Sequence, residues 1–92
     1  MDRGGYTALL LAASNNHTEV IEQLLAEGPM IDAQEKTQGY TPLIWAAHRG
    51  HREAVERLLA HGADTTLPDF EGKIAVDHAR EEGHKEILAL LR

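Results

Sequence analysis

Six histidines are the residues of this chain best suited to bind a metal ion or to carry a proton. His17, His51 and His84 recur at intervals of 34 and 33 residues. If each interval is one structural layer, these side chains lie too far apart for one metal ion to bridge. His48 and His51 flank Gly50 and could meet, but two ligands do not complete a metal site. We therefore expect the three recurring histidines to pack and to hydrogen-bond at the start of a helix, and we predict no metal site.

Carboxylates are the other group that could do chemistry. A pair such as Glu19 and Glu22 could act in acid–base catalysis, but such a pair is more typical of a solvated helix face. Ser14 is the only serine, and no nucleophile elbow surrounds it. No glycine-rich phosphate loop is present either. The residues therefore predict no catalytic group and no cofactor.

The segment from Gly39 to His51 shows which element must position these side chains. Thr41 can cap a helix N-terminus, and Pro42 fits the first helical position, where no N–H is needed. Gly50 suits a left-handed stop. These start and stop signals predict a helix over 42–49.

The same pattern occurs three times, over 5–17, 39–51 and 72–84. Each copy is followed by a second apolar segment, over 19–25, 53–59 and 86–91. A fixed period of this length is typical of stacked repeats. It predicts helices over 7–14, 18–27, 42–49, 52–61, 75–82 and 85–91, with a turn over 2–5.

Composition limits the classes of partner. The 92 residues carry a net charge of −6, which disfavours nucleic acid and anionic membranes as partners. The longest apolar run, over 8–13, is far below the roughly 20 residues that a membrane span needs. The chain has no cysteine and no signal peptide, so we expect a cytoplasmic protein.

These residues resemble the ankyrin repeat family. The second copy carries the pattern most fully: Gly39-x-Thr41-Pro42-Leu43-x-x-Ala46-Ala47-x-x-Gly50-His51, then Val55, Leu58-Leu59 and Gly62-Ala63-Asp64. Leu10, Ile44 and Asp77 stand where the family usually has histidine. The resemblance implies an all-α solenoid of stacked antiparallel helix pairs with β-hairpin-like loops. It implies one domain, 1–92, with repeats 1–35, 36–68 and 69–92, the third resembling a C-terminal cap.

The resemblance also implies a protein-interaction module that binds through loop tips and the concave face of the first helices, with a protein partner of unknown identity. The candidate binding residues are Arg3, Tyr6, Thr37, Gln38, Tyr40, Trp45, His48, Arg49, Phe70, Lys73 and Glu81. Ser14, Asn15, Glu71 and Glu82 occupy further variable positions. Tyr40, Trp45, His48 and Arg49 supply aromatic groups and a guanidinium, the groups that dominate binding hot spots, so they are the centre of this surface. For Trp45 the alternative, which its place between Leu43 and Ala46 favours, is packing between repeats. A partner with acidic or mixed character near Arg49 and Arg52 would suit it.

Two alternatives remain open. The chain could be a structural or capping fragment of a longer array, because Leu9, Leu10 and Leu11 leave the first unit apolar. A monomer is then expected, with weak self-association through the N-terminal end. An enzyme or metal-binding protein on the same scaffold is a further alternative, which would need polar side chains from separate units to converge in one enclosed site.

Overall fold

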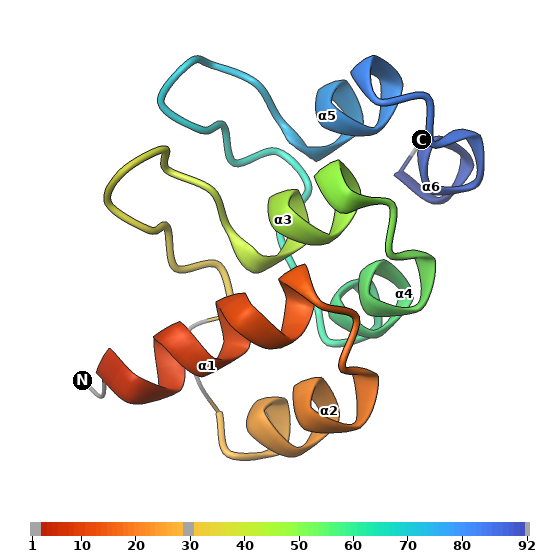
Figure 1. The fold of residues 1–92 in the computed structure, drawn as a ribbon. Helices are drawn as coiled ribbons and strands as arrows, with labels where there is room; N and C mark the ends of the chain where they lie inside the picture. Colours follow the sequence, from red (N-terminus) through yellow and green to blue (C-terminus); the bar gives the residue numbers. More distant parts are fainter. Residues whose placement is uncertain (1–2, 29–30, 92) are drawn as a thin grey trace.

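Six α-helices lie in two rows over residues 3–28 and 31–91, which the computed structural model describes, with side chains from Ala8 onward. The inner row holds α1 (Arg3–Ser14), α3 (Pro42–Arg49) and α5 (Ala75–Glu81). The outer row holds α2 (Thr18–Ala26), α4 (Arg52–Ala60) and α6 (Lys85–Leu91). Each inner helix packs on the outer helix that follows it, and each row stacks along one direction (Figure 1). The predicted all-α solenoid of helix pairs is confirmed.

The helix bounds follow the predicted ones closely except at the N-terminus. Helices α3 and α6 have the predicted limits, while α2, α4 and α5 each end one residue earlier. The predicted turn over 2–5 is wrong for residues 3–5, because α1 already begins at Arg3. Glycine lowers helix stability by only about 1 kcal/mol per residue, so Gly4 and Gly5 did not have to form a turn. None of the helices over residues 3–28 and 31–91 has the length and hydropathy of a membrane span.

Helix α3 has the termini that its sequence predicts. The Thr41 hydroxyl accepts the Ile44 N–H at 3.1 Å, and Pro42 occupies the first turn. Gly50 ends the helix with φ of 76°. Asn16 takes the same left-handed conformation after α1, with φ of 59°, which asparagine tolerates better than most residues.

Small side chains let the inner helices approach one another. Ala12, Ala46 and Ala79 occupy equivalent places in α1, α3 and α5 and are buried. Three more alanines of these helices are buried as well, and none of the six has more than 3% of its surface exposed: Ala13, Ala47 and Ala75. Leu9, Leu43 and Leu58 fill the space between the rows and are also fully buried. Neighbouring helix pairs bury their apolar faces against each other, because a single helix pair cannot cover its own apolar surface.

The recurring histidines tie each unit to the one before it. His51 donates from Nε2 to the carbonyl oxygen of Ser14 at 2.8 Å, and His84 donates to that of His48 at 3.1 Å. The expected hydrogen bonds are thus present at these two histidines, although the acceptor belongs to the preceding unit. Gly50 leaves room for the His84 ring, since a Cβ there would lie 2.6 Å from its Cε1.

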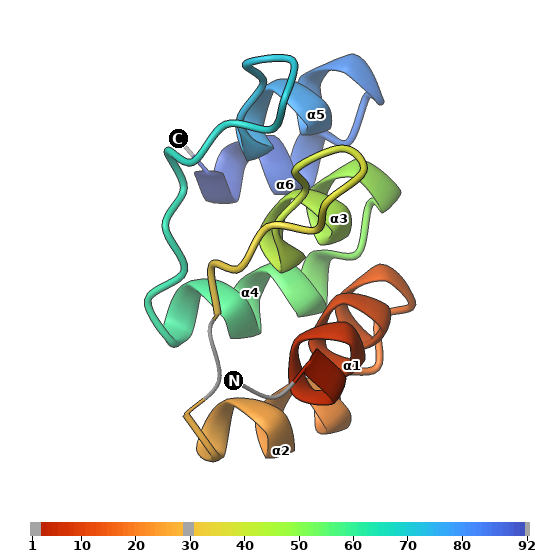
Figure 2. The ribbon, with the colours of Figure 1, turned by 90° about the vertical axis from the view of Figure 1, so that its left-hand side faces the viewer.

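Two long loops project from the inner row to the same side of the molecule (Figures 1 and 2). We call them finger 2 (residues 31–41) and finger 3 (residues 63–74). Finger 2 closes through the Glu35 N–H and the Tyr40 carbonyl at 3.0 Å, and finger 3 through the Asp69 N–H and the Lys73 carbonyl at 2.8 Å. The loops are therefore hairpin-like in their closure, although no strand is assigned in the described part of the chain.

Candidate functional site

We call the repeats 1–35, 36–68 and 69–92 unit 1, unit 2 and unit 3. Tyr40 lies at the centre of a cluster of rings where unit 2 meets unit 3. Its ring contacts Trp45 edge-on, with centroids 4.9 Å apart and planes at 70°. On the other side it meets His78 of α5, also at 4.9 Å and at 76°. Tyr40 is thus half-buried and held by rings from both units, so a partner would meet it already in place.

Two rings of this cluster, His78 and His48, form a hydrogen-bonded chain with Asp69 across two units. His78 is buried and donates from Nε2 to the Asp69 carboxylate at 2.8 Å. The Nδ1 atoms of His78 and His48 lie 3.3 Å apart, so one ring donates its N–H to the other. His48 is partly exposed, and its Nδ1 lies 4.0 Å from the Glu82 carboxylate. The chain therefore runs from buried Asp69 to the surface at His48 and joins finger 3, α5 and α3.

The Asp69 carboxylate also holds finger 3 in shape. Its Oδ1 accepts the N–H groups of Glu71 at 2.8 Å and of Lys73 at 3.0 Å. Burial alone would raise the pKa of Asp69, but the hydrogen bonds from the Lys73 N–H, His78 and the Glu71 N–H outweigh it. The pKa of Asp69 therefore lies below its ordinary 3.8.

Several of the predicted binding residues lie around the ring cluster. Thr37, Gln38, Tyr40 and Phe70 line one pocket between the two fingers. Phe70 is 64% exposed, and its N–H donates to the Gln38 carbonyl at 3.0 Å, which joins the fingers. Trp45 and His48 border the cluster from α3.

Charged predicted residues surround the same surface. Lys73 Nζ lies 3.1 Å from the Glu81 carboxylate, and Arg49 is exposed at the end of α3. Arg52, by contrast, is already paired with Glu56 at 3.2 Å and with Glu86 at 3.7 Å.

The predicted residues of unit 1 lie apart from this surface or beyond what is described. Ser14 ends α1 and Asn15 follows it in the turn, and the Ser14 carbonyl accepts a hydrogen bond from His51. Arg3 and Tyr6 belong to α1, but their side chains lie outside the described residues. The structure therefore brings together the predicted residues of units 2 and 3 only.

Sequence reasoning missed the two residues that hold the site together, Asp69 and His78. A comparison of the repeats could have found His78, because it replaces the residue equivalent to Trp45 with a polar ring. Asp69 opens an Asp-x-x-Gly turn ending at Gly72, a position where aspartate often accepts backbone N–H groups.

Across residues 3–28 and 31–91, no three histidine, aspartate or glutamate side chains are placed to share a metal ion.

Replacement of Asp69 should test this arrangement. We expect Asp69→Ala to lower the free energy of unfolding by about 3 kcal/mol, because it leaves His78 buried without its partner. Asp64→Ala, which removes an exposed carboxylate that caps Thr66, is the matched control and should cost much less. Urea unfolding followed by circular dichroism measures both.

The stability difference between the wild type and Asp69→Ala should also depend on pH. Because folding lowers the pKa of Asp69, its carboxylate contributes to the free energy of unfolding above about pH 4. This contribution is lost as the pH falls through the lowered pKa. The difference between the wild type and Asp69→Ala should therefore shrink below pH 4. A difference that stays constant down to pH 2 would contradict the assigned role of the carboxylate.

Comparison with known proteins agrees with the repeat architecture. A family model described as "Ankyrin repeats (3 copies)" matches residues 1–69. A search of curated proteins found no match. The family match covers about three quarters of the chain and both complete helix pairs of units 1 and 2. The chain belongs to the ankyrin repeat family.

Proposed function

We propose that the chain binds a protein partner through one face formed by the two fingers and the inner helices α3 and α5. Ankyrin repeats are generally protein–protein interaction modules and are typically not enzymes. The observation that carries the finer assignment is the exposed Phe70 beside the immobilised rings of Tyr40 and Trp45. Large rigid aromatic groups supply much of the binding energy of protein interfaces.

We call this surface the binding face and define it by nine residues: Thr37, Gln38, Tyr40, Trp45, His48, Arg49, Phe70, Lys73 and Glu81. Arg49 offers the most available cation, since no ion pair to it is found within the described residues. An acidic group of the partner would therefore meet Arg49 rather than Arg52, which two carboxylates of the chain already hold. Little change of shape is needed on binding, because the fingers are hydrogen-bonded to each other and to α5.

The opposite row is a suitable reference surface. On α2 and α4 the exposed groups pair with each other, as when Glu22 accepts from Arg57 at 3.2 Å and from His61 at 2.9 Å.

We propose further that repeats 1–35, 36–68 and 69–92 act as one domain. A chain without cysteine also suits the reducing cytoplasm, which we propose as its compartment.

Site-specific photocrosslinking tests the binding face. A benzophenone amino acid placed at Phe70 should crosslink a partner in cell extract, whereas the same group at Gln23 on α2 should not. Adding Arg49→Ala to the Phe70 probe should reduce the yield several-fold, because it removes the neighbouring cation. Equal crosslinking from the two positions would overturn the assignment.

A second role, as part of a longer array, has a specific observation in its favour. Val20 is 42% exposed, although its equivalents Ala54 and Ile87 are 0% and 2% exposed against the preceding unit. His17 is exposed too, while its equivalents each bond to a carbonyl of the preceding unit. Leu11, the equivalent of His78, is 58% exposed.

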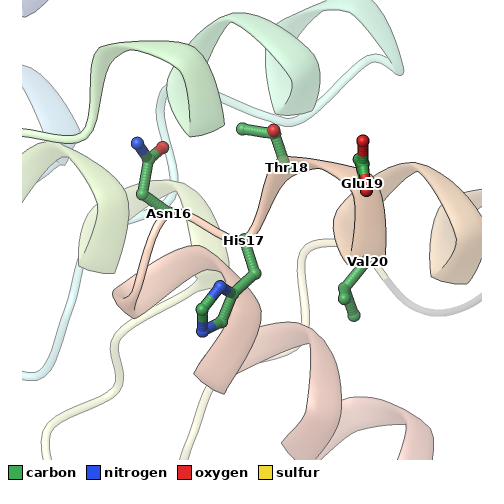
Figure 3. A pocket seen from close by; sticks show the side chains of 5 residues that line it. All are labelled: Asn16, His17, Thr18, Glu19 and Val20. Atoms are coloured by element: carbon green, nitrogen blue, oxygen red, sulfur yellow. The ribbon is translucent and has the colours of Figure 1, made fainter.

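Figure 3 shows the direction of these side chains around a hollow at the start of α2. His17 and Val20 point to one side of the ribbon, and Asn16 points to the other. The Asn16 side chain accepts the Ala54 N–H of unit 2 at 3.1 Å. His17 and Val20 therefore face away from unit 2, where another helix pair of the same kind would bury them.

Sedimentation velocity tests this second role. If the N-terminal face is an unfilled stacking surface, the chain should self-associate weakly at high concentration, and Leu11→Glu with Val20→Glu should abolish that association. Ala26→Glu, at an exposed alanine on α2, is the control and should not change it. If the wild type stays strictly monomeric at millimolar concentration, the proposed stacking role of the N-terminal face is contradicted.

A further inference from the structure

We propose that the pocket between finger 2 and finger 3 receives a cationic side chain, an arginine or a lysine, from the partner. The proposal rests on the proposed function and adds the chemistry of one contact.

The pocket has room for one long side chain. Its volume is about 260 Å³, and it is lined by Thr37, Gln38, Tyr40, Asp69, Phe70 and Glu71. The Phe70 N–H to Gln38 carbonyl bond fixes the spacing of the two fingers. The pocket therefore exists before a partner arrives, which lowers the entropy lost on binding.

Two aromatic rings are available to a cation there. Tyr40 is fixed by Trp45 and His78, and Phe70 lies against Gly39. The lack of a side chain at Gly39 permits that contact, since a Cβ would come within 2.5 Å of the Phe70 Cδ1. Phe70 nevertheless keeps 64% of its surface exposed, so a guanidinium or ammonium group can reach it.

The charges of the fingers favour a cation over a neutral group. The two fingers contain five carboxylates and two lysines: Asp32, Glu35, Asp64, Asp69 and Glu71, and Lys36 and Lys73. Burial raises the pKa of Tyr40, and the nearby carboxylates of Asp69 and Glu71 raise it further, while Lys73 opposes them only in part. The tyrosine hydroxyl thus lies in a negative potential, in which a positive charge is stabilised.

Glu71 is the most exposed carboxylate that lines the pocket, and an incoming cation would compete for it only with its long contact to Lys73. Its side chain is 78% exposed and lies 3.8 Å from Lys73, which makes its shorter contact, 3.1 Å, with Glu81. Asp69 cannot serve, because its oxygens are already taken by His78 and by two backbone N–H groups. An apolar side chain in the pocket would desolvate Glu71 without replacing its hydrogen bonds to water.

A pair of probes that differ only in charge tests the proposal on the full chain. N-acetyl-arginine amide and the neutral isostere N-acetyl-citrulline amide are titrated into the ¹⁵N-labelled protein, and amide chemical shifts are followed. The arginine probe should shift the amides of Gln38, Phe70 and Glu71 and bind about fivefold more tightly than citrulline. Glu71→Gln should reduce the preference for arginine over citrulline at least ~twofold, whereas Glu56→Gln on α4 should leave it unchanged.

Equal affinity for the two probes, or arginine shifts confined to other acidic surfaces, would overturn the proposal. Its failure can be told apart from failure of the proposed function. If crosslinking from position 70 succeeds but the probes show no charge preference, the binding face stands and only the cationic contact falls. If the arginine probe fills the pocket while crosslinking from position 70 fails, the pocket chemistry stands and the protein-binding role falls.

Discussion

The stacking of one helix pair on the next is the constraint on which the rest of this structure depends. A single helix pair leaves apolar surface uncovered, and a neighbouring pair buries it. Buried alanines such as Ala46 and Ala79 set how closely the inner helices lie, and His51 and His84 fix the direction of stacking through carbonyl bonds. The two fingers project to the same side because the helix pairs that carry them are stacked in this way.

The candidate site is a property of two units rather than of one. Tyr40 comes from unit 2, but its ring is held partly by His78 of unit 3. Finger 3 takes its shape from Asp69, whose carboxylate in turn fixes His78. Local unfolding of unit 3 would therefore release rings in both units, so the stability of the joint between α3 and α5 should control binding.

Much of the fold could be predicted from the sequence because its determinants are local and repeated three times. The Thr41 cap, Pro42 and the stop at Gly50 fixed α3 to the residue. Glycine tolerates both turns and helices, so the start of α1 could not be predicted in the same way. The candidate residues of units 2 and 3 lie near one another, as expected where equivalent repeat positions stack, and their role in binding stays a prediction. The link between Asp69 and His78 could not be predicted, because it depends on a side-chain contact at one divergent position.

The central claim is that a protein partner covers the fingers and inner helices of units 2 and 3. Hydrogen exchange of the chain, alone and bound to the partner identified by crosslinking, measures this most directly. We predict slower exchange on binding for amides over 37–40 and 70–73, and unchanged exchange on the outer helices α2 and α4. Protection confined to the outer helices, or to the exposed face of unit 1 around Val20, would contradict the claim.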